Sequence, residues 1–159
     1  MGAPRRPGRG SLSGSRAGAV RGVPDGKSKV QRAEEKCRGA AVRVAVTGCA
    51  GFIGSHTAAG LLERGHHVVG IDSLNSYYSV SLKEARLASL PGKNFTFIEG
   101  DLASAELAAN VIARHGISHI CHLAAQPGVR YSLKNPQAYV SSNIAAFVNV
   151  LEAARTHGV

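Results

Sequence analysis

The segment from Ala41 to Val159 alternates between two patterns of hydrophobic and polar residues. Short apolar runs rich in β-branched side chains are typical of buried parallel strands. These runs lie at residues 43–47, 67–71, 95–98 and 118–123. Longer segments with apolar residues every three or four positions are typical of helices. These segments lie at about 52–64, 80–90, 104–115 and 136–157. The alternation predicts an α/β fold in which a parallel sheet carries helices on both faces.

Right-handed crossovers between consecutive strands would give the strand order 3-2-1-4, which is the first half of a doubly wound sheet. The fourth strand would then be an open edge unless another segment pairs with it, so the predicted architecture is truncated. The last helix carries an apolar stripe whose spacing of four, three and four residues predicts packing in a core or an interface. The stripe consists of Val140, Ile144, Phe147 and Leu151.

Three glycines, Gly48, Gly51 and Gly54, connect the first predicted strand to the first predicted helix. Glycines let a pyrophosphate approach the unpaired N–H groups of a helix N-terminus, which carry a partial positive charge. Asp72 follows the second strand, where an acidic residue can accept hydrogen bonds from an adenosine ribose. A carboxylate repels a 2′-phosphate, and no arginine occurs at residues 73–75, so the pattern favours NAD over NADP. The alternative is an ordinary glycine-rich turn.

The positive charge of the chain is concentrated at its N-terminus. The sequence has 19 Lys and Arg residues against 10 acidic ones, and residues 1–40 hold ten of the former and three of the latter. This Gly-, Arg- and Ser-rich segment has few large apolar side chains and is predicted to be a disordered tail preceding one domain at 41–159. We interpret the tail as a non-functional extension, with an organelle-targeting peptide as the alternative. The overall charge therefore does not indicate nucleic-acid binding.

The cysteines and histidines do not predict a metal site. Cys37, Cys49 and Cys121 lack metal-ligand spacing, and the seven histidines are scattered. Unpaired cysteines favour a reducing compartment, here the cytoplasm, and no apolar run is long enough to cross a membrane. Cys49 lies in the glycine turn, where a helix N-terminus could lower the pKa of its thiol or where it is simply a small residue that fits.

Five segments resemble motifs of the extended short-chain dehydrogenase/reductase family, in the same order. They are TGCAGFIGSH, GIDSLNSYY, FIEGDL, HLAAQPGVRYS and YVSSNIAAFVNVLEAAR, within residues 42–159. Within that family they are most similar to the NAD-dependent epimerase/dehydratases that act as UDP-glucuronate 4-epimerases. The chain departs from the expected alanines at Cys49 and Pro127, and it has Gly60 inside the first helix, where glycine costs about 1 kcal/mol relative to alanine.

The resemblance implies a Rossmann-type fold, NAD as cofactor and roles for individual residues. The pyrophosphate would be held by Gly48, Cys49, Ala50, Gly51, Phe52, Ile53 and Gly54. The ribose would be held by Asp72, the adenine by Asp101 and Leu102, and the nicotinamide side by Leu123, Ala124 and Ala125. Gln126 and Arg130 would meet a UDP-sugar substrate, although Arg130 is equally compatible with a solvated loop. Asn143 would support the active site, or would simply be a polar residue that faces solvent. The last helix would form half of a homodimer interface.

The family's reaction transfers a hydride from C4 of the sugar to NAD and returns it to the other face of a 4-keto intermediate. It requires a tyrosine acid/base, a lysine four residues later that lowers the pKa of that tyrosine, and a Ser or Thr on a fifth strand. None of the four tyrosines has a lysine at that spacing, so no catalytic residue is assigned. We therefore expect the NAD-binding half of a nucleotide-sugar 4-epimerase, inactive by itself. The alternatives are a stand-alone NAD-binding module without catalysis and a truncated product without function.

Overall fold

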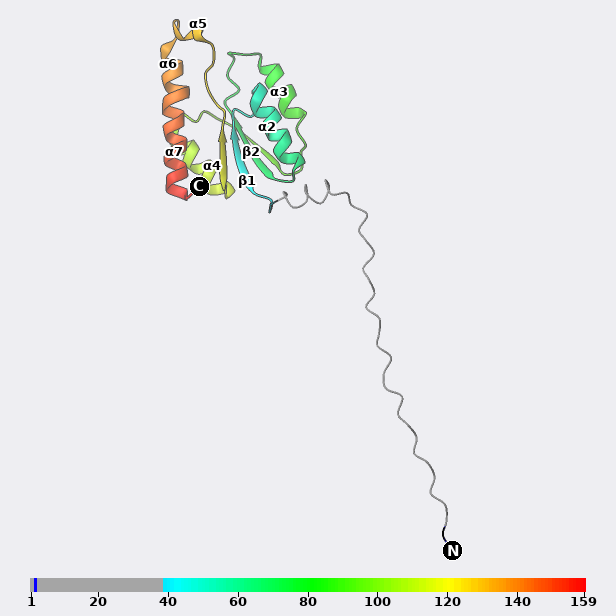
Figure 1. Ribbon diagram of the computed structural model, residues 1–159. Helices are drawn as coiled ribbons and strands as arrows, with labels where there is room; N and C mark the ends of the chain where they lie inside the picture. Colours follow the sequence, from blue (N-terminus) through cyan, green and yellow to red (C-terminus); the bar gives the residue numbers. More distant parts are fainter. Residues whose placement is uncertain (1, 3–38) are drawn as a thin grey trace. The chain divides into compact units, whose positions relative to one another are not determined.

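The computed structural model describes residue 2 and residues 39–159, and within them one α/β domain (Figure 1). Its strands are β1 (Arg43–Thr47), β2 (His67–Asp72), β3 (Phe95–Glu99) and β4 (His119–His122). Its helices are α2 (Phe52–Glu63), α3 (Val80–Ala88), α4 (Ala105–His115), α5 (Val129–Ser132), α6 (Pro136–Tyr139), η1 (Val140–Ala145) and α7 (Ala146–His157). The predicted disordered tail, apart from residues 2, 39 and 40, lies outside the described residues, as does Cys37.

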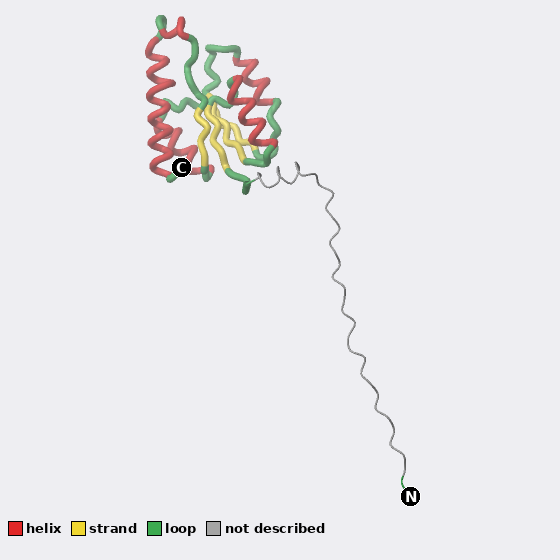
Figure 2. Tube along the Cα trace, viewed as in Figure 1, coloured by secondary structure: helices red, strands yellow, loops and turns green. Residues whose placement is uncertain are grey.

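The four strands form one parallel sheet in the order β3-β2-β1-β4, which confirms the predicted fold class (Figure 2). In the register, Val46 of β1 lies beside Gly70 of β2 and Cys121 of β4. Because β1 is central and all strands run in one direction, their carboxyl ends meet at one edge of the sheet. Among the described residues β4 pairs with β1 alone, so its outer edge is open as expected.

Helices cover both faces of the sheet (Figure 1). Alternating residues of the inner strands point to opposite faces, which follows from the two-residue period of a strand. One face packs against α4 and α7 through a cluster that includes Ala45, Ile71, Val111 and Val150. The other packs against α2 and the end of α3 through a cluster that includes Val44, Val46, Leu62 and Leu90.

The helix ends are set by short polar residues and glycines in the sequence. The hydroxyl of Ser79 accepts from the N–H of Leu82 at the start of α3, and Ser104 caps α4 in the same way through the N–H of Leu107. Such caps satisfy N–H groups that have no partner within the helix. Gly116 and Gly158 follow α4 and α7 in the left-handed conformation that commonly ends a helix.

The last helix has the predicted bounds and two features that the pattern did not specify. The predicted helix at 136–157 is confirmed as one uninterrupted run of α6, η1 and α7 that ends at Gly158, but its π-helical segment η1 and the short helix α5 were not predicted. The apolar stripe was predicted to pack in a core or an interface, and of these two alternatives the core is excluded, since Val140, Ile144, Phe147 and Leu151 are 44–59% exposed. The helix packs on α4 through the smaller side chains of Ala146, Val150 and Ala153, which allow the two backbones to lie close.

None of the helices in the described part of the chain has the length and hydropathy of a membrane span.

Candidate functional site

A cavity of about 590 Å³ lies where the carboxyl ends of the strands meet. Its walls come from the glycine turn after β1, the loops after β2, β3 and β4, and the start of the last helix. Its lining includes Gly48, Phe52, Asp72, Asp101 and Ala124. Ligands of open α/β sheets bind at this edge, where neighbouring connections leave in opposite directions. The volume is in the range of small-molecule and cofactor sites, which is about 300–1,000 Å³.

Close backbone contacts hold the glycine turn. Gly48 has φ of 68°, a conformation that favours glycine, and its N–H donates to the carbonyl of Ile71 at 2.7 Å. A Cβ on Gly48 would lie 2.9 Å from backbone atoms of Ala124, and a Cβ on Gly54 would overlap the carbonyl oxygen of Gly48. The first and third glycines therefore let the strand ends and the start of α2 lie in direct backbone contact.

The N-terminus of α2 faces the cavity without a side-chain cap. The first helical hydrogen bond runs from the N–H of Ser55 to the carbonyl of Gly51 at 3.0 Å. The preceding N–H groups of Phe52, Ile53 and Gly54 have no hydrogen-bond acceptor among the described residues. These are unpaired donors at the positive end of a helix, which is the arrangement that binds phosphate groups.

The N–H groups of Cys49 and Ala50, also predicted to hold the pyrophosphate, have partners within the protein. Cys49 donates to the carbonyl of Ile71 at 3.3 Å, and Ala50 donates to Oδ2 of Asp72 at 3.1 Å. Neither residue lines the cavity. Their backbone therefore shapes the turn, while donors that could reach a ligand come from the first turn of α2.

Asp72 is the last residue of β2 and is only 8% exposed, with its carboxylate at the cavity wall. Besides the bond from Ala50, its Oδ1 accepts from the N–H of Leu74 at 2.9 Å and lies 3.5 Å from Nζ of Lys83. Lys83 was missed by the sequence analysis, because it lies eleven residues further along the chain on the second helix. The carboxylate is thus fixed in place and partly neutralised.

The loop after β3 supplies the wall next to Asp72. Asp101 is exposed and its Oδ1 accepts from the N–H of Ala103 at 2.9 Å, while Leu102 is buried beside it. The amide of Asn149, on α7, donates to the carbonyls of Leu102 and Ala103 at 2.9 Å each. Asn149 therefore fixes this wall of the cavity from the last helix, a role that its place in a helical pattern did not reveal.

Thr47, another residue that the sequence analysis missed, holds the wall formed by Leu123, Ala124 and Ala125. Its Oγ1 accepts from the N–H groups of Leu123 and Ala124 at 3.0 Å each and lies 2.9 Å from Nδ1 of His122. The hydroxyl has one hydrogen, so that hydrogen is directed to Nδ1, which must be the unprotonated ring nitrogen. Burial lowers the pKa of His122, in agreement with a neutral ring.

Asn143 forms two hydrogen bonds with the backbone of the loop that follows β4. Its Oδ1 accepts from the N–H of Gln126 at 2.7 Å, and its Nδ2 donates to the carbonyl of the same residue at 3.1 Å. Asn143 lies in η1, and the wide turns of π-helices are frequent at functional sites. The side chain of Gln126 is buried and donates to the carbonyl of Pro127, while Arg130 is exposed on α5. Neither Gln126 nor Arg130 lines the cavity, so their substrate roles stay predictions.

Tyr77, Tyr78, Tyr131 and Tyr139 cluster at the rim of the cavity. The rings of Tyr77 and Tyr131 are 5.0 Å apart, and those of Tyr131 and Tyr139 are 6.3 Å apart. The hydroxyl of Tyr139 donates to the carbonyl of Pro127 at 2.7 Å and lies against that of Gly128. The cluster therefore ties the loop after β2 to the loop after β4.

Cys49 does not have the lowered pKa that one reading of the sequence allowed. Burial and the nearby Asp72 carboxylate raise the pKa of its thiol from 9.0 to about 12. Its Sγ also lies where a side chain on Gly70 of β2 would be. Cys49 is therefore the small buried residue that the alternative interpretation described.

We expect Cys49→Ala to reduce the loss of stability at alkaline pH. The unfolded thiol ionises above pH 9 while the folded one stays protonated, so stability is complete below pH 9 and falls as pH rises towards 12. At pH 10 this contributes about 1.4 kcal/mol of destabilisation that the variant lacks. Urea unfolding of the wild type and the variant at pH 7 and pH 10 measures the difference. An equal loss of unfolding free energy between the two pH values in both proteins would contradict the raised pKa of Cys49. Cys121→Ser is the matched control.

The strand order, the glycine turn after β1 and the acid at the end of β2 define a Rossmann-type α/β protein. A family model described as GDP-mannose 4,6 dehydratase matches residues 45–159. The chain belongs to this family, and its predicted resemblance to UDP-glucuronate 4-epimerases is confirmed by curated relatives.

UDP-glucuronate 4-epimerase 1 of Arabidopsis thaliana is 45% identical over 129 residues, covering 81% of this chain and 30% of that protein. Protein CapI of Staphylococcus aureus is 48% identical over 114 residues, covering 72% of this chain and 34% of CapI. The chain thus spans about a third of the length of the curated relatives it matches.

Solved structures agree in fold and cofactor. The UDP-glucose 4-epimerase of Stenotrophomonas maltophila, with bound NAD and formylated UDP-arabinopyranose, aligns with a TM-score of 0.65 and 35% identity over 74% of this chain and 34% of that one. The Thermus thermophilus UDP-glucose 4-epimerase in complex with NAD aligns with a TM-score of 0.63 and 35% identity over 74% of this chain and 35% of that one. NAD is thus a cofactor of this group of proteins.

Proposed function

We propose that this chain is the NAD-binding part of a nucleotide-sugar 4-epimerase of the UDP-glucuronate type. One observation carries the proposal: the unpaired N–H groups of Phe52 and Ile53 and the buried carboxylate of Asp72 border one cavity of about 590 Å³. The first can bind a pyrophosphate and the second a ribose. The similarity to epimerases solved with NAD supports the same assignment.

The residues around the cavity fit the parts of NAD. Phe52, Ile53 and Gly54 would donate to the pyrophosphate, and Asp72 would accept from the adenosine ribose through oxygens held by Ala50 and Leu74. Asp101 and Leu102 would flank the adenine. Leu123, Ala124 and Ala125, held by Thr47, would lie under the nicotinamide, where small side chains permit close approach. When bound, NAD would accept a hydride from the sugar and return it.

We propose that the chain by itself binds the cofactor without turning over a sugar. Two tyrosines, Tyr77 and Tyr78, line the cavity, but Ser81 and Leu82 follow them at the spacing where the family's lysine would be. The two carboxylates that line the cavity, Asp72 and Asp101, are the residues assigned above to the adenosine end of the cofactor. A stand-alone NAD-binding module and a product without function remain the alternatives, and they differ in whether NAD binds.

The finer assignments stay predictions. They are UDP-glucuronate as the sugar, contact of Gln126 and Arg130 with it, a homodimer through the last helix and a cytoplasmic location. The exposed stripe that includes Ile144 and Phe147 supports an interface on that helix. Among the described residues no cluster of His, Cys, Asp and Glu is arranged to hold a metal ion.

Titration of the 159-residue chain with NAD, followed by calorimetry, tests the proposal, and saturable binding of one NAD per chain is expected. We expect Phe52→Pro to weaken NAD binding about tenfold, because it removes one N–H donor to a charged group. Proline is favoured at the first position of a helix, and Gly51 already has the extended conformation that precedes it, with φ −72° and ψ 171°. The fold should therefore be preserved.

Phe52→Ala is the matched control, since it removes the same exposed ring but keeps the N–H group. Its NAD affinity should stay within about threefold of the wild type. The change removes the cation–π contact between the exposed Phe52 ring and the guanidinium of Arg86, at 5.9 Å, and such a contact contributes little free energy at an exposed site. Equal affinities for Phe52→Pro and the wild type would refute the pyrophosphate assignment. Absence of NAD binding by the wild type would leave the chain without the proposed function.

A further inference from the structure

Lys83 is one of two charged residues that are buried in the described part of the chain, and the other is Asp72. The lysine is 7% exposed, and its Nζ donates to the backbone carbonyl of Asn75 at 3.0 Å and to Oδ1 of the same residue at 3.1 Å. The same Nζ lies 3.5 Å from Oδ1 of Asp72. A buried lysine is costly unless it is paired, so this position is held by specific partners.

This pairing changes the charge that the cavity presents beside Asp72. A lone carboxylate repels a phosphate, but a carboxylate with an ammonium 3.5 Å away is close to electrically neutral at the distance of a ligand. Both Asp72 and Lys83 line the cavity. Selectivity for NAD over NADP is therefore not set by the aspartate alone.

A second cation lies on the same wall. The guanidinium of Arg86 lies over the ring of Phe52 and its Nη1 donates to the carbonyl of Ala50 at 3.4 Å, next to the N–H that binds Asp72. The wall thus carries one carboxylate and two positive side chains. Around such a wall the electrostatic penalty for a 2′-phosphate is smaller than the sequence pattern implies.

We infer that Lys83 is a specificity-determining residue whose pairing with Asp72 sets the ratio of the affinities for NAD and NADP. The inference rests on the proposed NAD binding. Lys83 would act on the adenosine end of the cofactor by neutralising Asp72, while Asp72 still accepts from the ribose hydroxyls. The competing interpretation gives Lys83 a structural role only, in which it holds the loop after β2 through Asn75.

The test is Lys83→Met in the 159-residue chain, with NAD and NADP titrated separately by calorimetry. Loss of the ammonium leaves the charge of Asp72 uncompensated, so the dissociation constant for NADP should rise about tenfold more than that for NAD at low salt. Adenosine 2′,5′-bisphosphate and adenosine 5′-monophosphate should show the same change in ratio, because they probe the adenosine end alone. A purely structural role predicts equal weakening for both ligands of each pair, and that result would overturn the inference.

Two further variants keep the test decisive. Lys83→Gln removes the charge but keeps a donor toward the Asn75 oxygens, so it should fold and should change the ratio in the same direction as Lys83→Met. Lys93→Met makes the same change in net charge at an exposed position away from the cavity and should leave the ratio unchanged. An unchanged ratio in Lys83→Gln, in a chain whose wild type binds NAD, refutes the inference alone. A wild type that binds neither NAD nor adenosine 5′-monophosphate refutes the proposed function.

Discussion

Gly54→Ala should destabilise the protein by about 3 kcal/mol or more and abolish NAD binding. The added methyl group would overlap the carbonyl oxygen of Gly48 and lie 2.7 Å from its carbonyl carbon and 2.9 Å from Cα of Cys49. All three atoms belong to the backbone, so no side chain can rotate away to make room. The start of α2 must then move from the end of β1, and its unpaired N–H groups move with it. Urea unfolding followed by circular dichroism measures the change.

The same helix provides the matched control. A Cβ on Gly60 would approach only Nη1 of Arg64, at 3.2 Å, and this is the end of a flexible side chain. Gly60→Ala should therefore stabilise the protein by about 0.5–1 kcal/mol, the usual gain when alanine replaces glycine in a helix. Opposite signs for the two Gly→Ala changes are the expected result. Similar effects at both positions would mean that the contact between α2 and the glycine turn does not constrain the fold.

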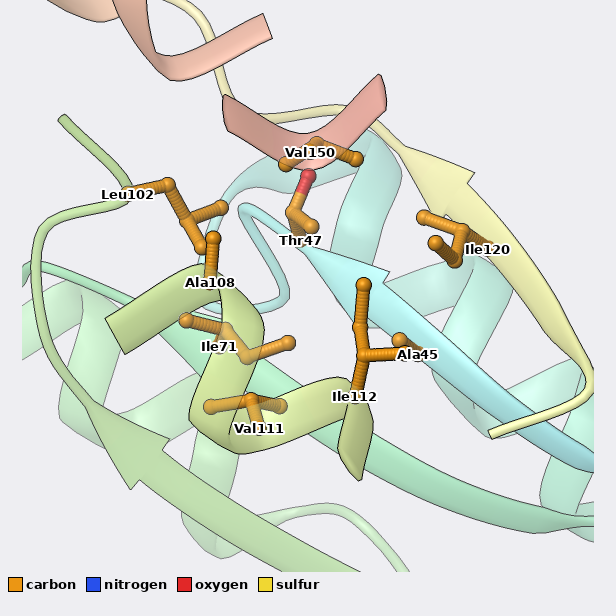
Figure 3. Close-up of a pocket in the computed structure, with 9 residues that line it drawn as sticks. All are labelled: Ala45, Thr47, Ile71, Leu102, Ala108, Val111, Ile112, Ile120 and Val150. Atoms are coloured by element: carbon orange, nitrogen blue, oxygen red, sulfur yellow. The ribbon is translucent and has the colours of Figure 1, made fainter. Parts of the chain in front are cut away.

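Thr47→Val should cost about 2–4 kcal/mol and weaken NAD binding, because valine fills the same space without a hydroxyl. Figure 3 shows the Thr47 hydroxyl among aliphatic side chains from the sheet, α4 and α7. With valine at position 47, three groups lose the hydroxyl that they share as a hydrogen-bond partner. They are the N–H groups of Leu123 and Ala124 and the Nδ1 of His122. The segment that follows β4 then loses its attachment to β1, which is where the nicotinamide would lie. Chemical denaturation and NAD titration measure the two effects.

Thr47→Ser keeps the hydroxyl and removes one buried methyl group, so it should cost only about 1 kcal/mol and should preserve NAD affinity. Comparison of Thr47→Ser with Thr47→Val therefore separates the contribution of the hydroxyl's hydrogen bonds from the contribution of the methyl group's packing. If Thr47→Ser were as destabilising as Thr47→Val, packing of the methyl group would be the dominant contribution and the hydrogen-bonding role would be wrong.

The sequence predicted the fold well because local patterns determine it. The four apolar runs became the four strands, and the right-handed crossover rule led to the observed order β3-β2-β1-β4. The glycine turn and Asp72 were recognisable because each meets a backbone or charge requirement that few other residues satisfy. The described residues place them around one cavity.

The residues that fix the cavity walls were not predictable in the same way. Thr47, Lys83 and Asn149 each contact a segment distant in the sequence, and nothing in their local pattern indicates the partner. Lys83 lies on an ordinary amphipathic helix, where a lysine is expected to face solvent. The π-helix around Asn143 was not predicted, because apolar spacing at 140–151 suits an ordinary α-helix and the partner of Asn143, Gln126, is distant in the sequence.

The tyrosine cluster at the cavity rim has a spectroscopic consequence. The sequence contains no tryptophan and four tyrosines, and all four belong to this cluster. Tyrosine emission therefore originates entirely at this rim, from the loop that follows β2 and from the short helices α5 and α6 that follow β4, whereas α2, α3, α4, α7 and the sheet carry no tyrosine. Fluorescence reports the local environment of the rim, whereas circular dichroism reports the whole domain. Because the two signals have separate origins, a rim that opens before the domain unfolds would produce two distinct transitions without any label.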